Sequence, residues 1–162
     1  MVELTDVAQP IGIARIHQQE WSNVKTADVG TYIGKKEMWG KGIGQQITAA
    51  ILEMAFNQLN VDRCEAWSVE YNSRAHRTLE RCGFKKGGVM RKAAYVNGRK
   101  WDGYHFDILR KEYSDMRMDL LKQTLGDRLE EYFRKHCTVG CQQSTEPSSA
   151  SEKKEAPSTA SN

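Results

Sequence analysis

Hydrophobic residues recur along the chain with two different periods, and each change of period marks a change of predicted element. In residues 27–33 every second position is Ala, Val, Thr or Ile, which predicts a strand. In residues 43–59 the Ile, Leu, Met and Phe positions fall at helical intervals, which predicts a well-buried helix. Residues 11–21 and 63–69 are further predicted strands, and the second contains Trp67.

Turn-forming residues separate the elements that follow. Asn72 or Ser73 is a suitable N-cap for a second helix, and Gly83 supplies its stop. Asn97-Gly98 is a strong hairpin signal in the middle of residues 85–111, which predicts one strand on either side of it. Strands thus alternate with helices until two strands close the domain. This order is typical of an α/β to α+β fold with a mixed sheet.

The C-terminal part of the chain has a different pattern. Residues 114–137 place leucines and aromatic residues at helical spacing, with Gly126 as a weak point in the helix. Residues 142–162 contain no large apolar side chain, so burial cannot offset the entropy lost on ordering them. The sequence therefore predicts one domain at residues 1–113, an added amphipathic helix at residues 114–141 and a disordered tail after it.

Composition narrows the class of protein. The chain has 162 residues and a formal net charge of +3, which is too modest to indicate a nucleic-acid partner. It contains no apolar run of the about 18 residues that span a bilayer. Cys64, Cys82, Cys137 and Cys141 match neither a zinc site nor a CxxC redox pair. We therefore expect a cytoplasmic protein with reduced thiols, no metal and no membrane contact.

The sharpest local feature is the segment Trp39-Gly40-Lys41-Gly42-Ile43-Gly44-Gln45, between a predicted strand and a predicted helix. Three alternate glycines permit a tight turn with no Cβ in front of a ligand, and a helix N-terminus binds anions such as a pyrophosphate. Gln45 stands where the dinucleotide fingerprint needs a glycine, and Gly42 stands where a P-loop needs Ser or Thr. By itself, the cluster is equally consistent with a plain turn.

A second segment favours a phosphate-binding turn. Residues 72–84 have the form Asn-x-x-Ala-x-x-x-Leu-Glu-x-x-Gly-Phe, and with the glycine cluster they resemble the two cofactor motifs of the GNAT superfamily of N-acetyltransferases. Residues 88–113 resemble the closing strands of the branch that holds ribosomal-protein N-terminal, spermidine and amino-sugar acetyltransferases. The resemblance covers residues 11–113. It departs from the family pattern at Trp39, where many members carry Arg or Gln.

The resemblance implies a mixed, splayed β-sheet flanked by helices, with acetyl-CoA as co-substrate between two parallel strands. It implies that the pantetheine arm pairs with the strand at Tyr32, Ile33 and Gly34. It also implies that Asn72 bonds the arm and that Arg74, Arg77 and Lys41 lie near the adenosine phosphates, although a solvated helix face explains either arginine at least as well. The backbone amides implied to hold the pyrophosphate are those of Gly40, Lys41, Gly42, Ile43, Gly44 and Gln45.

The implied reaction is direct attack of a primary amine on the thioester, with a protein N-terminus, a polyamine or an amino sugar as acceptor. A backbone amide near Ile33 is the candidate oxyanion donor. Asp28 and Glu70 are the candidate catalytic bases, because they lie on or just after the two strands that border the cofactor. Each is also consistent with an ordinary solvated carboxylate. Leu79 stands where many relatives carry the Tyr that protonates the leaving thiolate.

A further departure concerns the acceptor side. The family normally begins with a strand and two helices that build much of the acceptor site, and only residues 1–9 precede the matching strand here. We therefore expect an N-terminally shortened fold. Its site is completed by a second chain, as in a homodimer, or by the C-terminal helix, or else the chain is a truncated product with weak activity. Two alternatives remain open beside the active enzyme. One is a non-catalytic acetyl-CoA-binding module with the apolar stripe from Leu121 to Phe133 as its partner surface; the other is a nucleotide-binding regulator.

Overall fold

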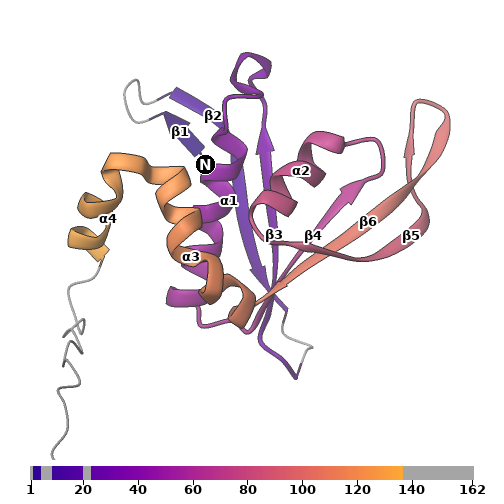
Figure 1. Ribbon diagram of the computed structural model, residues 1–162. Coiled ribbons are helices and arrows are strands. Elements are labelled where there is room, and N and C mark those ends of the chain that lie inside the picture. The colour runs from indigo at the N-terminus through magenta and orange to yellow at the C-terminus, as the bar shows by residue number, and fades with distance from the viewer. Residues whose placement is uncertain (1, 5–8, 20–22, 137–162) are drawn as a thin grey trace, which may run out of the picture.

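The computed structural model describes residues 2–4, 9–19 and 23–136, which form a six-stranded sheet with helices packed against it (Figure 1). The strands are β1 (Val2–Leu4), β2 (Gln9–Gln18), β3 (Thr26–Ile33), β4 (Arg63–Val69), β5 (Lys85–Val96) and β6 (Arg99–Leu109). The helices are α1 (Ile43–Glu53), α2 (Ser73–Arg81), α3 (Arg110–Leu125) and α4 (Leu129–His136), with short helical segments at Lys36–Met38, Met54–Gln58 and Gly126–Arg128. Among these described helices, none combines the length and the apolar character that crossing a membrane requires.

The sheet is mixed, with strand order β1-β2-β3-β4-β6-β5. β3 and β4 run parallel, and the other neighbouring strands are antiparallel. Pairing between β3 and β4 ends at Asp28 opposite Glu65, although β3 continues to Ile33 and β4 to Val69. Beyond that pair the two strands separate, and we call the space between their C-terminal halves the β3–β4 gap. This geometry confirms the splayed mixed sheet predicted from the sequence.

The helices α1, α2 and α3 pack on one face of the sheet, since α1 contacts both of the others (Figure 1). Strand residues that face these helices are buried, including Ala27, Val29, Cys64, Ala66 and Phe106. The intervening residues point to the opposite face, where Ile13, Tyr32 and Trp67 are exposed. We call this second face the open face, because none of the described helices covers it.

The C-terminal helix differs from its prediction in two ways. It begins at Arg110 and not at residue 114, because the Glu112 carboxylate accepts the Leu109 N–H at 3.0 Å and caps the first turn. It also breaks at Gly126, whose φ of +51° ends α3 before α4 starts. The prediction of one continuous helix over residues 114–137 was therefore wrong in its start and its continuity. Residues 137–162, with the predicted tail, and Trp21, the predicted end of the first strand, lie outside the described residues.

Helix α3 belongs to the core. Tyr113, Leu120 and Leu121 are buried, and Leu121 lies with Ala49 and Glu53 of α1 around a small, partly open pocket of about 40 Å³. The apolar stripe proposed as a partner surface thus starts with a leucine that is already covered. Burial of Leu121 against α1 follows from the helical period, since an apolar face of a helix must pack against an apolar neighbour.

A buried carboxylate links α1 to α3. The Glu53 carboxylate accepts hydrogen bonds from the Tyr113 hydroxyl and from Nε of Arg117, the latter at 2.9 Å. Phe56 stacks on the Tyr113 ring with 4.9 Å between the centroids. Burial by itself would raise the pKa of Glu53, but the hydrogen bonds from Arg117 and Tyr113 outweigh it and lower that pKa. Glu53 therefore stays charged and fixes the position of α3.

Candidate functional site

The glycine cluster forms the turn between β3 and α1. Gly40 and Gly42 have φ angles of +78° and +77°, a left-handed conformation that glycine adopts without strain. A Cβ built on either residue would meet no atom within 4 Å, so open space lies beside both. Gly42 is also the N-cap of α1, and the first N–H groups of a helix have no acceptor within the helix. The turn therefore combines an accessible backbone with a helix N-terminus.

A run of backbone N–H groups in this turn is available for a ligand. From Gly40 to Gly44, five consecutive N–H groups find no acceptor among the residues that the structure describes. The Gln45 N–H differs, because it donates to the Gly42 carbonyl at 3.0 Å. Of the six amides predicted to hold a pyrophosphate, Gln45 is therefore already bonded within the protein. The other five form the kind of concave donor set that binds phosphate groups.

Basic side chains border the turn. Thr78 Cγ2 would lie 3.6 Å from a Cβ on Gly44, so α2 passes beside the first turn of α1. Arg77 is the neighbour of Thr78 on α2, and Lys41 belongs to the turn itself. Both side chains are exposed, and neither has an ion-pair partner among the described residues. An anion bound at the turn would thus meet unpaired positive charge.

Backbone groups of β3 line one side of the β3–β4 gap. The Gly34 N–H donates to the Ile11 carbonyl at 2.9 Å. Because antiparallel bonding alternates, even-numbered residues of β3 bond to β2 and odd-numbered ones point their backbone toward β4. Of the predicted arm-pairing residues Tyr32, Ile33 and Gly34, only Ile33 therefore faces the gap. The gap-facing residues past the last β3–β4 pair are Val29, Thr31 and Ile33.

Strand β4 presents a matching edge. The Glu70 N–H donates to the Asp102 carbonyl at 2.9 Å, so the even-numbered residues of β4 bond to β6. Trp67 and Val69 consequently turn their backbone groups toward the gap. Two strand edges without strand partners therefore face each other inside the sheet. Such edges bind extended ligands that carry amide groups, because buried backbone donors and acceptors require partners.

Side chains cap the last gap-facing carbonyl on each strand. The Trp39 indole Nε1–H donates to the Ile33 carbonyl at 2.9 Å. On the other side, the Val69 carbonyl accepts the Asn72 backbone N–H at 2.9 Å. His76 Nε2 lies 3.1 Å from the same carbonyl, which can only accept, so this nitrogen carries the proton. The caps lie at the open end of the gap. Among the described residues, the inner backbone groups of the gap, such as those of Thr31, have no partner.

Asn72 is the N-cap of α2, as predicted. Its Oδ1 accepts the Ala75 N–H at 3.3 Å, which satisfies one of the free donors of the first helical turn. The side-chain amide nitrogen of Asn72 has no partner among the described residues. It therefore remains a donor near the end of β4.

The two candidate catalytic carboxylates lie at opposite ends of the gap. Asp28 is at the closed end, where Arg15 Nη2 approaches its Oδ1 to 2.5 Å. That contact is not aligned as a hydrogen bond, and this buried Oδ1 has no hydrogen-bond partner among the described residues. Glu70 follows β4 at the open end and accepts the Asp102 N–H at 3.4 Å. About 16 Å of strand separates the two levels, so Asp28 and Glu70 do not act on one atom together.

A row of ionisable side chains crosses the open face at the closed end of the gap. The Glu65 carboxylate lies 3.1 Å from Arg63 Nη1 and 3.4 Å from His105 Nε2. Nowhere in the described part of the chain do three His, Cys, Asp or Glu side chains gather as a metal site would require. The alternation of side chains along β4 places Glu65 on the open face. Which residues lie beside it on β3 and β6 depends on the register of these strands. The register aligns His17, Asp28, Glu65, Asp107 and Lys85 across β2, β3, β4, β6 and β5.

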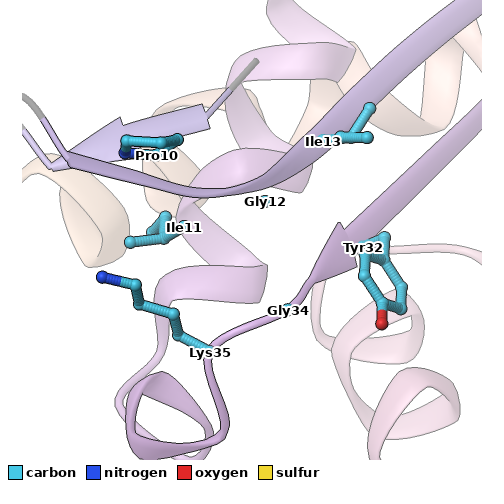
Figure 2. Close-up of a pocket in the computed structure, with 7 residues that line it drawn as sticks. All are labelled: Pro10, Ile11, Gly12, Ile13, Tyr32, Gly34 and Lys35. Atoms are coloured by element: carbon cyan, nitrogen blue, oxygen red, sulfur yellow. The ribbon is translucent and has the colours of Figure 1, made fainter.

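A shallow apolar hollow of about 540 Å³ lies beside the end of β3. Figure 2 shows that Ile13 and Tyr32 line it from the neighbouring strands β2 and β3, and that Lys35 approaches from the loop after β3. The register pairs Ile13 with Tyr32, so both side chains belong to the open face. The hollow thus lies on the open face between β2 and β3, and β3 also borders the gap.

The buried thiols near the site are expected to be unreactive. Burial raises the pKa of Cys64 and of Cys82 to about 12, so neither forms a thiolate near neutral pH. In the native protein we expect no labelling of either thiol by a disulfide reagent at about pH 8, and full labelling in guanidinium chloride. Peptide mapping by mass spectrometry separates them from Cys137 and Cys141. Native-state labelling of Cys64 or Cys82 would contradict their burial.

The geometry is that of an acetyltransferase fold, with a split sheet and a glycine turn at a helix N-terminus. A family profile described as an acetyltransferase (GNAT) domain matches residues 1–85, more than half of the chain. The chain therefore belongs to the GNAT acetyltransferase family, as the motifs predicted.

Curated relatives and solved structures agree with this assignment. The chain is 31% identical over 88 residues to an uncharacterized N-acetyltransferase p20 of Bacillus licheniformis, covering 54% of this chain and 49% of the relative. It is 30% identical over 102 residues to the putative ribosomal N-acetyltransferase YdaF of Bacillus subtilis, covering 63% and 55%. The chain thus spans about half the length of these relatives.

Among solved structures, a spermidine N-acetyltransferase SpeG chimera from Vibrio cholerae and hSSAT superposes with a TM-score of 0.63 at 25% identity, covering 70% of this chain and 66% of that one. A GNAT-family acetyltransferase from Bacillus anthracis superposes with a TM-score of 0.59 at 21% identity, covering 67% and 64%. The second likeness is one of fold alone.

Proposed function

We propose that the chain is an N-acetyltransferase that transfers the acetyl group of acetyl-CoA to a primary amine. The observation that supports the proposal most directly is that two sets of backbone groups without partners among the described residues follow each other along the chain. Five free N–H groups at residues 40–44 suit a pyrophosphate, and the gap-facing edge of β3 suits the amides of a pantetheine arm. Acetyl-CoA carries these two chemical groups in the same order.

In this proposal each part of the site binds a different part of the co-substrate. The N–H groups from Gly40 to Gly44 hold the pyrophosphate, and Lys41 and Arg77 balance its charge. The gap-facing groups of β3 and the side-chain amide of Asn72 bond the pantetheine arm. The thioester then lies between β3 and β4, where the open face gives an amine access.

The proposed chemistry asks little of the protein beyond positioning. The amine nitrogen attacks the thioester carbonyl carbon, the bond to sulfur breaks, and CoA leaves as a thiolate that takes a proton from solvent. A gap-facing N–H such as that of Ile33 stabilises the charge that develops on the carbonyl oxygen. The amine proton passes to a base, for which Asp28 and Glu70 are the proposed residues. The spermidine and ribosomal acetyltransferases among the relatives indicate the first acceptors to test.

Calorimetry followed by a thiol-release assay tests the proposal. We expect acetyl-CoA and CoA to bind and ATP to bind weakly, because ATP lacks the arm that pairs with β3. We then expect acetyl-CoA to release thiol in the presence of spermidine, an amino sugar or an N-terminal peptide. D28N and E70Q variants identify the base by their loss of rate. Equal binding of ATP would indicate a nucleotide regulator, and binding without transfer to any amine would indicate a non-catalytic module.

A further inference from the structure

Trp39 connects three separate parts of the site. Its indole N–H bonds the Ile33 carbonyl at the end of β3, at 2.9 Å. Its ring faces the guanidinium of Arg74, whose Cζ lies 4.2 Å from the ring centroid. Arg74 belongs to the first turn of α2, the helix that follows β4. The residue after Trp39 is Gly40, the first of the five free amides.

These contacts join the two halves of the site at the open end of the β3–β4 gap. β3 and β4 have no ladder there, so other contacts must hold their spacing. Trp39 reaches from β3 to the helix that follows β4, and it also anchors the start of the glycine turn. A hydrogen bond to a carbonyl and a cation–π contact are each worth about 1 kcal/mol. Together they fix where the turn lies relative to the edge of β3.

We propose that Trp39 is a positioning residue that holds the phosphate-binding turn and the β3 edge at the spacing required by a ligand that spans both. The proposal rests on the proposed function, since it assumes that CoA occupies the turn and the gap together. A ligand that bridges two preorganised sites gains affinity because the protein loses little entropy when it binds. A ligand that fills only the turn gains nothing from the spacing. Trp39 therefore acts on the ligand through Ile33 and the turn.

Comparing two ligands distinguishes a positioning role of Trp39 from direct contact of Trp39 with the phosphates. CoA spans the turn and the gap, whereas adenosine 3′-phosphate 5′-diphosphate carries the same phosphates and no pantetheine. We expect Trp39→Phe, which keeps a ring for Arg74 but removes the N–H, to raise the Kd of CoA about five- to tenfold. We expect the Kd of the short ligand to stay unchanged. Isothermal titration calorimetry measures both, and thermal unfolding checks that the variant is folded.

The chain contains a matched control pair. Trp101 stacks with Arg99 at 4.1 Å on β6, a contact of the same type as Trp39 with Arg74. We expect Trp101→Phe to leave both affinities as in the wild type. Arg74→Ala keeps the indole N–H of Trp39 but removes its contact to α2. We expect this variant to raise the Kd of CoA and to leave the Kd of the short ligand unchanged.

Each outcome of the titrations has a defined meaning. If Trp39→Phe raises the Kd of both ligands equally, the effect lies in the turn alone and the proposal is overturned. The proposal is also overturned if neither Kd changes. Equal weakening in Arg74→Ala would assign Arg74 to a phosphate and overturn its bridging role. If the wild type does not bind CoA, the proposed function fails instead, and that result is distinguishable because it needs no variant.

Discussion

Replacing Gly42 with valine is expected to raise the Kd of acetyl-CoA about 100-fold or more, because the new side chain occupies the space in front of the free amides. Gly42 has a φ of +77° and no atom within 4 Å of its built Cβ position. A β-branched residue also disfavours this φ, so the turn relaxes and its N–H groups no longer converge. Isothermal titration calorimetry with acetyl-CoA measures the loss.

A matched glycine elsewhere in the chain controls for backbone strain. Gly98, in the turn between β5 and β6, has a φ of +76° and is equally free of neighbouring atoms. Gly98→Val therefore introduces similar strain far from the proposed phosphate-binding turn, and we expect it to lose comparable stability while it binds acetyl-CoA normally. Wild-type affinity in a folded Gly42→Val variant would remove the pyrophosphate assignment.

Glu53→Gln is expected to lower the free energy of unfolding by about 2–3 kcal/mol, because it removes the charge that pairs with Arg117 between α1 and α3. Breaking a fully buried pair costs about 3–5 kcal/mol, and the partial exposure of Arg117 reduces that figure. Urea unfolding followed by far-ultraviolet circular dichroism measures the change. Glu80→Gln, an exposed glutamate on α2, is the control, and we expect it to change stability by less than about 0.5 kcal/mol.

The same carboxylate predicts a pH dependence. The pKa of Glu53 in the folded protein lies below its ordinary value of 4.5. Its contribution to stability is therefore complete above that ordinary value and is lost as the pH falls through the lower folded-state pKa. We expect the difference in stability between wild type and Glu53→Gln to be constant around neutral pH and to shrink in acid. A difference that grows on acidification would contradict the direction of the pKa shift.

Local signals in the sequence predicted several elements of the fold correctly. The alternation in residues 27–33, the Asn72 cap and the Asn97-Gly98 turn all appear in the structure as predicted. Each depends on steric preferences or hydrogen bonds between residues close in the chain, which the sequence contains in full. The glycine turn belongs to the same group, since positive φ at Gly40 and Gly42 is a property of residues without a side chain.

Other features depend on which strands pair and in what register. The backbone groups of β3 point alternately to β2 and to β4. The register decided that those of Ile33 face the β3–β4 gap while those of Tyr32 and Gly34 bond to β2. The end of the β3–β4 ladder placed Asp28 beside Glu65 and far from Glu70. A shift of one residue in the β2–β3 pairing would reverse the first assignment, and a shift in the β3–β4 pairing would give Asp28 another neighbour; no local pattern fixes either register.

By itself, the sequence determined the order of strands and helices, the glycine turn and the family, because these depend on neighbouring residues and short motifs. The tertiary structure decided which backbone groups remain free in the gap, and that the Trp39 ring reaches Arg74 on α2. These facts join residues distant in the chain. They follow from the packing of whole elements, which minimises the free energy of the fold and not of any one segment.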